Sequence, residues 1–217
     1  MPIDFYCTDA SPPCAAVLLT AKAIGIELNP KPIDLFKKEH LSPEFIKINP
    51  QHTVPVIDDN GLILSESRVI MQYLQNQYGK DESLYPTDPK KRAIVDQRLF
   101  FDLGTLYSRF KDYFYPVAFY GASDFDPEKL EKVNEAFRFL DSFLADSEYA
   151  AGDTLTIADL SLVASVSACE AACYDLSSYK NVSRWYAKVK DTAPGYEEIN
   201  GRIVLEFKQL VDQLRKK

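Results

Sequence analysis

The arrangement of apolar residues changes along this 217-residue chain near residue 80. Up to that point, short apolar runs typical of strands alternate with helical stretches, in the order β-α-β-α-β-β-α. A segment rich in Gly, Pro and charged residues follows, and beyond it the spacing is helical with no clear strand. We therefore predict an α+β fold, with an α/β domain at 1–80, a linker at 81–88 and an all-helical domain at 89–217.

Several element boundaries coincide with residues that favour them. Ser11 suits a helix N-cap, Pro12-Pro13 suits the first turn, and Gly25 suits the end of that helix. The pair Asn60-Gly61 predicts a hairpin, and Thr156 with Asp159 resembles a capping box. The other expected strands are 3–6, 27–34, 56–57 and 62–64. The other expected helices are 42–48, a helix that starts at 65 or 66 and ends at 78, 88–121, 126–145, a helix that starts at 156, 181–191 and 202–215.

Composition excludes several classes of partner and site. The net charge of −7 and pI of about 5.0 argue against nucleic acid or an anionic membrane as the main partner. No apolar run approaches the length of a membrane span and no signal peptide is recognised, so we expect a cytoplasmic protein. The four cysteines form neither a CxxC pair nor a Cys/His cluster, which predicts reduced thiols and no metal site.

The segment 49–68 carries the strongest signs of a binding site. Pro55 removes a backbone donor and biases Val54 toward an extended conformation, in which Val54 can pair with an extended peptide. The helix that starts after the hairpin offers unpaired N–H groups and a positive dipole, which suit a carboxylate. Together these features predict a site for a small acidic peptide.

Ser11 has two interpretations that the sequence leaves open. It is either a plain N-cap or a hydroxyl that donates to a bound thiolate at the positive end of a helix. Making a free thiol mostly anionic at neutral pH requires a pKa shift of about two units, or about 2.7 kcal/mol. One charge-assisted hydrogen bond contributes about 1.5–3 kcal/mol and the dipole about 0.3–1 kcal/mol, so the two together suffice.

Polar residues near this segment have a bland and a functional interpretation. His40 and His52, the only histidines, are either ordinary surface groups or donors to a terminal carboxylate of the ligand. Glu66, Ser67 and Arg68 are either simple first-turn residues or a binding set. In the second case Ser67 binds a carboxylate, Glu66 binds an α-amino group, and Arg68 adds positive charge or orders the site.

An aromatic cluster in the long helix at 88–121 predicts a cleft. Its six rings fall within 13 positions, so they cannot all face one core, and some should line a cleft or another chain. An apolar cleft facing Ser11 would hold an apolar electrophile. The cluster consists of Tyr107, Phe110, Tyr113, Phe114, Tyr115 and Phe119.

Five segments in order make essentially the whole chain resemble a cytosolic glutathione S-transferase of the insect delta class, or delta/epsilon-like. They are Ser11-Pro12-Pro13-Cys14, 40–45, 49–55, Glu66-Ser67-Arg68 and 151–159. The resemblance implies a thioredoxin-like domain before the helical one, a cis peptide at Val54-Pro55, and a cytoplasmic homodimer. It implies conjugation of the glutathione thiolate to small apolar electrophiles in xenobiotic metabolism, that is, detoxification. Side activity as a glutathione peroxidase or dehydrochlorinase stays open.

The resemblance also implies roles for individual residues. Ser11 would be catalytic, and Asp102 would reach the site of the partner subunit. Glutathione would be bound by Ser11, His40, His52, Val54, Glu66, Ser67, Arg68 and Asp102. The electrophile pocket would be formed by Pro13, Leu35, Tyr107, Phe110, Tyr115, Phe119 and Phe207. One departure is Ala15, where delta enzymes usually have Arg.

Two alternatives share the same fold. The chain could be a non-catalytic protein that binds apolar ligands, or a subunit of a larger assembly. It could also be a thiol–disulfide oxidoreductase with Cys14 or Cys7 as nucleophile, although Ser11 stands where such an enzyme would place its first cysteine.

Overall fold

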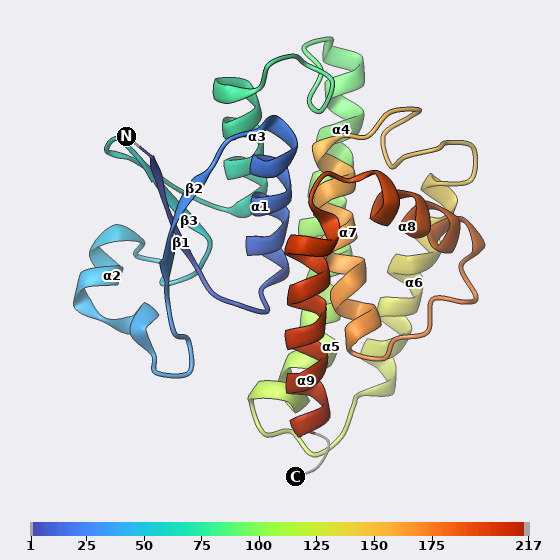
Figure 1. Ribbon diagram of the computed structural model, residues 1–217. Helices are drawn as coiled ribbons and strands as arrows, with labels where there is room; N and C mark the ends of the chain where they lie inside the picture. The colour runs from blue at the N-terminus through green and yellow to red at the C-terminus, as the bar shows by residue number, and fades with distance from the viewer. Residues whose placement is uncertain (1, 215–217) are drawn as a thin grey trace.

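The computed structural model describes residues 2–214 and is shown in Figure 1. Met1 and residues 215–217 lie outside the described residues. They are the first residue of the expected domain at 1–80 and the last three of the expected domain at 89–217. A sheet with its helices occupies one side of the molecule, and a larger helical part occupies the other (Figure 1). The α+β organisation predicted from the sequence is confirmed.

The sheet is mixed and has the strand order β2-β1-β3-β4. Its strands are β1 (Ile3–Cys7), β2 (Leu28–Pro32), β3 (Val56–Asp59) and β4 (Leu62–Ser65). β1 pairs parallel with β2 and antiparallel with β3, which in turn pairs antiparallel with β4. Asn60 and Gly61 have φ values of 52° and 95°, as a tight hairpin turn requires, so the predicted hairpin is present.

Helices cover both faces of this sheet. α1 (Pro12–Ile24) and α3 (Ser67–Tyr78) lie on the face toward the helical part, and α2 (Pro43–Ile48) lies on the other side (Figure 1). A short 3₁₀ turn at Glu39–Leu41 precedes α2. α1 packs against α3 and α7, and Ala15 on α1 is fully buried, so an arginine at position 15 would need a buried partner for its charge.

The helical part begins with one long rod that is not uniformly α-helical. α4 (Pro89–Phe101) runs into a π-helical segment, η2 (Asp102–Leu106), and then into α5 (Tyr107–Phe119). The sequence predicts a single helix here, because periodicity does not reveal a local change of hydrogen-bonding pattern. The remaining elements are α6 (Pro127–Phe143), α7 (Ile157–Ala171), α8 (Lys180–Thr192), a second π-helical segment η3 (Glu197–Gly201) and α9 (Arg202–Leu214).

α7 forms the centre of the helical part. Every residue of α7 except Glu170 is buried, as expected for a helix enclosed by others. The predicted capping box of Thr156 and Asp159 is present at its start. The buried Asp159 carboxylate also accepts hydrogen bonds from the Ala150 amide at 2.7 Å and from the Trp185 indole at 2.8 Å. Burial raises the pKa of Asp159 although these donors oppose it.

Across residues 2–214, no helix combines the length and the apolar character that crossing a bilayer would demand.

Candidate functional site

Strand register brings the predicted site residues to one edge of the sheet. Tyr6 near the end of β1 pairs with Val56 at the start of β3, and Val56 pairs with Ser65 at the end of β4. The segments that continue from these positions therefore leave from the same edge. They carry Ser11 after β1, Val54 before β3, and the start of α3 after β4.

Ser11 is the N-cap of α1, and its backbone is extended with φ −105° and ψ 111°. Its Oγ accepts a long hydrogen bond of 3.4 Å from the Cys14 amide. Accepting that bond uses an oxygen lone pair and leaves the hydroxyl proton able to donate elsewhere. The half-buried Ser11 can therefore cap the helix and donate to an anion at the positive end of α1 at once.

The cysteines closest to this position are poorly suited to act as nucleophiles. All four cysteines are thiols outside any disulfide, as predicted. Burial raises the pKa of Cys14 to about 12 and that of Cys7 to about 11. Because the thiolate is the reactive form, these values disfavour a thiol–disulfide oxidoreductase.

The N-terminus of α3 carries no side-chain cap. Glu66 occupies the N-cap position, and its side chain makes no capping hydrogen bond. The Glu66 carbonyl already accepts from the Ile70 amide at 2.9 Å, whereas the amides of the first turn have no intrahelical acceptor. Glu66 also has φ 67° and ψ 102°, a conformation costly for a residue other than glycine. Such local strain is concentrated at binding sites, where it presents backbone groups to a ligand.

A buried network of charged side chains is hydrogen-bonded to Ser67. The Arg68 guanidinium donates to the Ser67 hydroxyl at 2.8 Å through Nη1 and to the Asp102 carboxylate at 2.5 Å through Nη2. The Ser161 hydroxyl donates to the same Asp102 oxygen at 2.5 Å. Arg68 is 7% exposed and Asp102 is 0% exposed, so the guanidinium points into the protein and orients Ser67.

The position of Asp102 differs from the sequence expectation. Its carboxylate is fully buried, and one of its oxygens is bound by Arg68 and Ser161 of its own chain, so the side chain faces the interior of this chain. The physical reason is its place in η2, which turns the side chain inward toward α3 and α7. Sequence reasoning also missed Ser161. Its signal is a hydroxyl in a helix rich in apolar residues, since buried hydroxyls need partners, but Ser165 and Ser167 give the same signal.

His40 and His52 lie together near the same edge. Their ring centroids are 6.3 Å apart, and the buried Nδ1 of His40 has no hydrogen-bond partner. The ring of Phe45 on α2 contacts that of Tyr6 on β1 at 6.0 Å, which docks the α2 region beside the end of β1. His40 and His52 therefore lie close together at the end of the sheet from which Val54 leaves.

The expected electrophile pocket divides into two groups of rings. The Tyr107 and Tyr115 hydroxyls are 3.0 Å apart, and Phe119 packs edge-on against Tyr115 with centroids 4.9 Å apart. The Arg68 guanidinium lies 5.6 Å from the Tyr107 ring centroid, which places this group beside the start of α3. Pro13 is half-buried on the first turn of α1, and Leu35 is exposed in the segment after β2.

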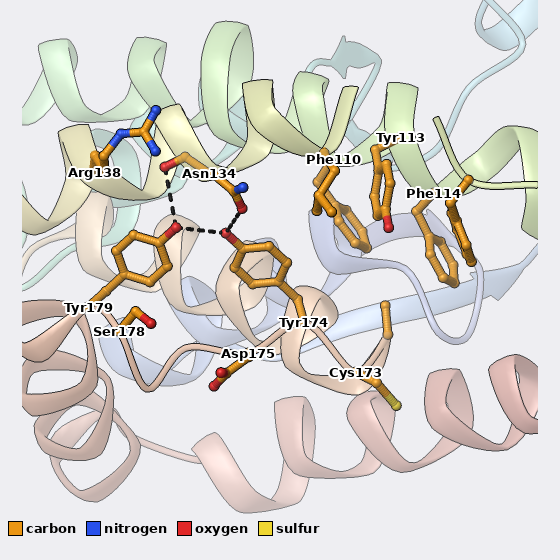
Figure 2. Close-up of a pocket in the computed structure, with 13 residues that line it drawn as sticks. Phe110, Tyr113, Phe114, Asn134, Arg138, Cys173, Tyr174, Asp175, Ser178 and Tyr179 are labelled. Carbon is orange, nitrogen blue, oxygen red and sulfur yellow. Dashed lines mark hydrogen bonds between the residues drawn. The ribbon is translucent and has the colours of Figure 1, made fainter. Parts of the chain in front are cut away.

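Phe110 and Phe207 belong to the second group instead. Phe110 stacks on Phe114 with centroids 5.4 Å apart, and Phe207 contacts Phe114 at 5.5 Å. On an α-helix, Phe110 and Tyr115 point about 140° apart, so they lie on different faces of α5. Phe110 lines a separate cavity shown in Figure 2, whose lining includes neither Ser11 nor any other residue of the sheet edge. The expectation that Phe110 faces the cleft near Ser11 is therefore corrected.

Within residues 2–214, no three His, Cys, Asp or Glu side chains gather closely enough to hold a metal ion.

Comparisons with known proteins agree on one family. Residues 5–83 match the family described as glutathione S-transferase, N-terminal domain, and residues 104–191 match glutathione S-transferase, C-terminal domain. A delta-class glutathione transferase from Nilaparvata lugens is 56% identical, with TM-score 0.95 over 98% of this chain and 100% of that chain. The Bombyx mori glutathione transferase BmGSTD1 is 42% identical, with TM-score 0.93 over 97% of this chain and 98% of that one. A glutathione transferase homologue from Drosophila mojavensis, solved with bound glutathione, is 36% identical, with TM-score 0.93 over 98% of this chain and 97% of that chain.

Proposed function

This chain belongs to the glutathione S-transferase family, and from that premise we propose how its own residues bind glutathione and activate the sulfur. The chain is a glutathione transferase with a thioredoxin-like N-terminal part and a helical C-terminal part. We assign residues 1–80 to glutathione binding, 81–88 to the linker and 89–217 to the helical domain. The observation that carries the proposal is the convergence of Ser11 and the uncapped start of α3 at one sheet edge.

Glutathione would lie along that edge as an extended peptide. The Val54 backbone would pair with it as an added strand does. The Ser67 amide and hydroxyl would bind the carboxylate of the γ-glutamyl residue, and Glu66 would bind its α-amino group. His40 and His52 would hydrogen-bond the glycyl carboxylate, since their rings lie close together and the His40 Nδ1 is unpaired. Arg68 would act by orienting Ser67.

The sulfur would then meet the Ser11 hydroxyl at the start of α1. Donation from Ser11 and the helix dipole would favour the thiolate without a metal or a general base. The enzyme would thus raise the thiolate population and hold the thiolate beside its target. The capping bond from Cys14 leaves the Ser11 proton available for this task.

The second substrate would be a small apolar electrophile bound beside Ser11. Tyr107, Tyr115 and Phe119 would supply the apolar wall, with Pro13 and Leu35 at its edges. Burial raises the pKa of both tyrosines, so their hydroxyls remain neutral donors. We propose a role in xenobiotic detoxification in the cytoplasm.

We propose a homodimer as the working form. Large apolar side chains remain exposed on β4, α3, α4, η2 and α6, and burying them against a second copy would stabilise the protein. These side chains are Leu62, Ile63, Val69, Ile94, Phe100, Leu103 and Phe139.

Replacing Ser11 tests the mechanism. Ser11→Ala should lower turnover with glutathione and chlorodinitrobenzene roughly 50-fold near pH 6.5, because the thiolate pKa rises by about two units. Glutathione binding, measured by calorimetry, should change little.

A matched control is Ser42→Ala. Ser42 caps α2 through the same kind of bond, with its Oγ 3.2 Å from the Phe45 amide. Both variants lose a cap, and only the Ser11 variant should lose turnover. Equal turnover in the two variants would remove Ser11 from the proposed role.

A further inference from the structure

A small cavity lies at the C-terminal end of α1, the end opposite to Ser11. It is lined by the last turn of α1, by α3, by the segment that joins α3 to α4, and by residues that precede α7 and follow α8. Its volume is about 220 Å³, below the range of sites for drug-sized ligands, so a ligand here would have few heavy atoms. None of its lining residues takes part in the proposed glutathione site.

One buried side chain that lines this cavity has an unsatisfied acceptor. Gln75 on α3 is 5% exposed, and its Oε1 has no hydrogen-bond partner within residues 2–214. The Gln75 Nε2 donates to the Asp81 carbonyl at 2.6 Å, and because a carbonyl only accepts, this bond fixes which end of the amide is the oxygen. A buried acceptor without a partner costs free energy, so Gln75 Oε1 favours a ligand that brings an N–H or O–H donor.

The end of α1 supplies more acceptors at the same place. The amide of Gly25, the C-cap, donates to the carbonyls of Ala21 and Lys22. The carbonyls of Ala23 and Ile24, two residues that line the cavity, belong to the last turn, which has no intrahelical donor for them. The negative end of the helix dipole lies here as well, and it favours a cation.

Two consecutive residues of opposite charge also line the cavity. A Cβ atom added at Gly25 would lie 3.5 Å from the Lys80 Nζ, so the ammonium group lies against the end of α1. The Ser83 hydroxyl and its amide, which donates at 2.9 Å, lower the pKa of Asp81, so Asp81 stays ionised. Among the residues that the structure describes, neither Lys80 nor Asp81 forms a salt bridge. Both charges are therefore available to a ligand that carries one charge of each sign.

Apolar side chains form much of the remaining lining. They come from α1, from the segment before α4, and from the segments before α7 and after α8. These side chains are Ala23, Ile24, Leu84, Leu155 and Pro194. A ligand with a short aliphatic group would bury that group against them.

We infer that this cavity binds a small zwitterion, namely a free α-amino acid with a short aliphatic side chain. Its ammonium group is bound by the Asp81 carboxylate, by Gln75 Oε1 and by the end of α1. Lys80 binds its carboxylate, and its side chain contacts the apolar lining. The site shares no residue with the proposed glutathione site, so the inference does not depend on the role of Ser11.

The test is a titration of the full-length protein with L-valine, followed by saturation-transfer difference NMR. Saturating S-hexylglutathione is present throughout, because it occupies the glutathione site, where a free amino acid could otherwise replace the γ-glutamyl residue. Saturable binding of L-valine should persist under this condition.

A blocking variant locates the site. Ser83→Trp, at an exposed lining position, should fill the cavity and weaken binding roughly ten-fold. The matched control is Ser177→Trp, also exposed, whose amide donates to Asp175 at 2.9 Å as that of Ser83 donates to Asp81. Ser177 does not line this cavity, so its variant should bind L-valine as the unmodified protein does.

Charge variants test the class of ligand. Lys80→Gln and Asp81→Asn should each weaken binding about three-fold, because each removes one ion pair at an exposed position. Lys90→Gln, at an exposed position outside the cavity, should leave binding unchanged. Isobutylamine and isobutyrate, which carry one charge each, should both bind at least about three-fold more weakly than L-valine. These measurements decide the question if Ser83→Trp fails to fold.

Three outcomes would overturn the inference. The first is loss of the L-valine signal when S-hexylglutathione is added, which would place the amino acid in the glutathione site. The second is equal affinity for L-valine in the unmodified protein and in the folded variants of the lining residues. The third is binding of isobutylamine or isobutyrate as tight as that of L-valine, which would refute the zwitterion.

Discussion

Removing the charge of Asp102 should destabilise this enzyme strongly, because the carboxylate is buried and paired with Arg68. In Asp102→Asn the shape is kept, but Arg68 becomes a buried cation without a counter-ion. The two side chains are 8% and 0% exposed and their charged atoms are 2.5 Å apart, so water cannot replace the lost partner. Breaking a buried pair in this way costs about 3–5 kcal/mol, or about 6–20 °C in melting temperature for a chain of this length.

The assay is urea unfolding followed by fluorescence, at one fixed protein concentration because dimerisation would shift the midpoint. Ser161→Ala is the comparison, since it removes only a hydroxyl donor from the same carboxylate oxygen and should cost about 1.5–3 kcal/mol. The double variant Arg68→Met with Asp102→Leu removes both charges and should recover much of the stability.

Asp102→Asn should affect glutathione binding more than the chemical step. Arg68 also donates to Ser67 at 2.8 Å, so a displaced guanidinium should raise the KM for glutathione more than it lowers kcat. Stability of Asp102→Asn within about 0.5 kcal/mol of the unmodified protein would refute the charge argument. So would a double variant no more stable than Asp102→Asn alone.

Three further outcomes follow from the structure. In Ser11→Ala the rising limb of kcat/KM against pH should move from about 6.5 toward about 8.5, because a lost donor to the thiolate raises its pKa, and an unmoved profile would contradict this. Asp159→Ala leaves the donors of Ala150 and Trp185 unsatisfied and should cost about 3–5 kcal/mol, seen as a lower thermal midpoint by circular dichroism. A midpoint equal to that of the unmodified protein would exclude this role. Maleimide at pH 8 should label the exposed Cys173 and spare Cys14, whose pKa is raised to about 12 by burial. Mass spectrometry of the labelled peptides measures this, and labelling of Cys14 before Cys173 would contradict the prediction.

Local sequence signals located the sheet edge well. The N-cap at Ser11, the Asn60-Gly61 turn and the capping box at Thr156 act through nearby backbone groups, so their effects can be read from short segments. The register between β3 and β4 then follows from the hairpin turn, and β3 pairs in turn with β1.

The direction in which a side chain leaves its helix was much harder to predict than the helix to which the residue belongs. Asp102 and Phe110 lie in the expected helix, but the contacts of their side chains depend on how that helix is rotated about its axis. A π-helical segment at Asp102–Leu106 changes this rotation, and the apolar pattern of the sequence does not reveal it. The pairing of Asp102 with Arg68 and Ser161 depends on packing between elements far apart in the chain, which a short segment does not encode.

The π-helical segment sets the phase of everything that follows it in the rod. Each residue added to or removed from a helix turns the downstream side chains by about 100°. Within Asp102–Leu106, however, a π turn holds about one residue more than an α turn, so deleting one residue there and restoring a regular helix would leave the rings of α5 pointing almost as they do now. The same deletion within α4 or α5 would turn the rings that follow it by about 100°. The π-helical segment is therefore a place in this rod where the chain can gain or lose one residue while the aromatic side chains of α5 keep their directions.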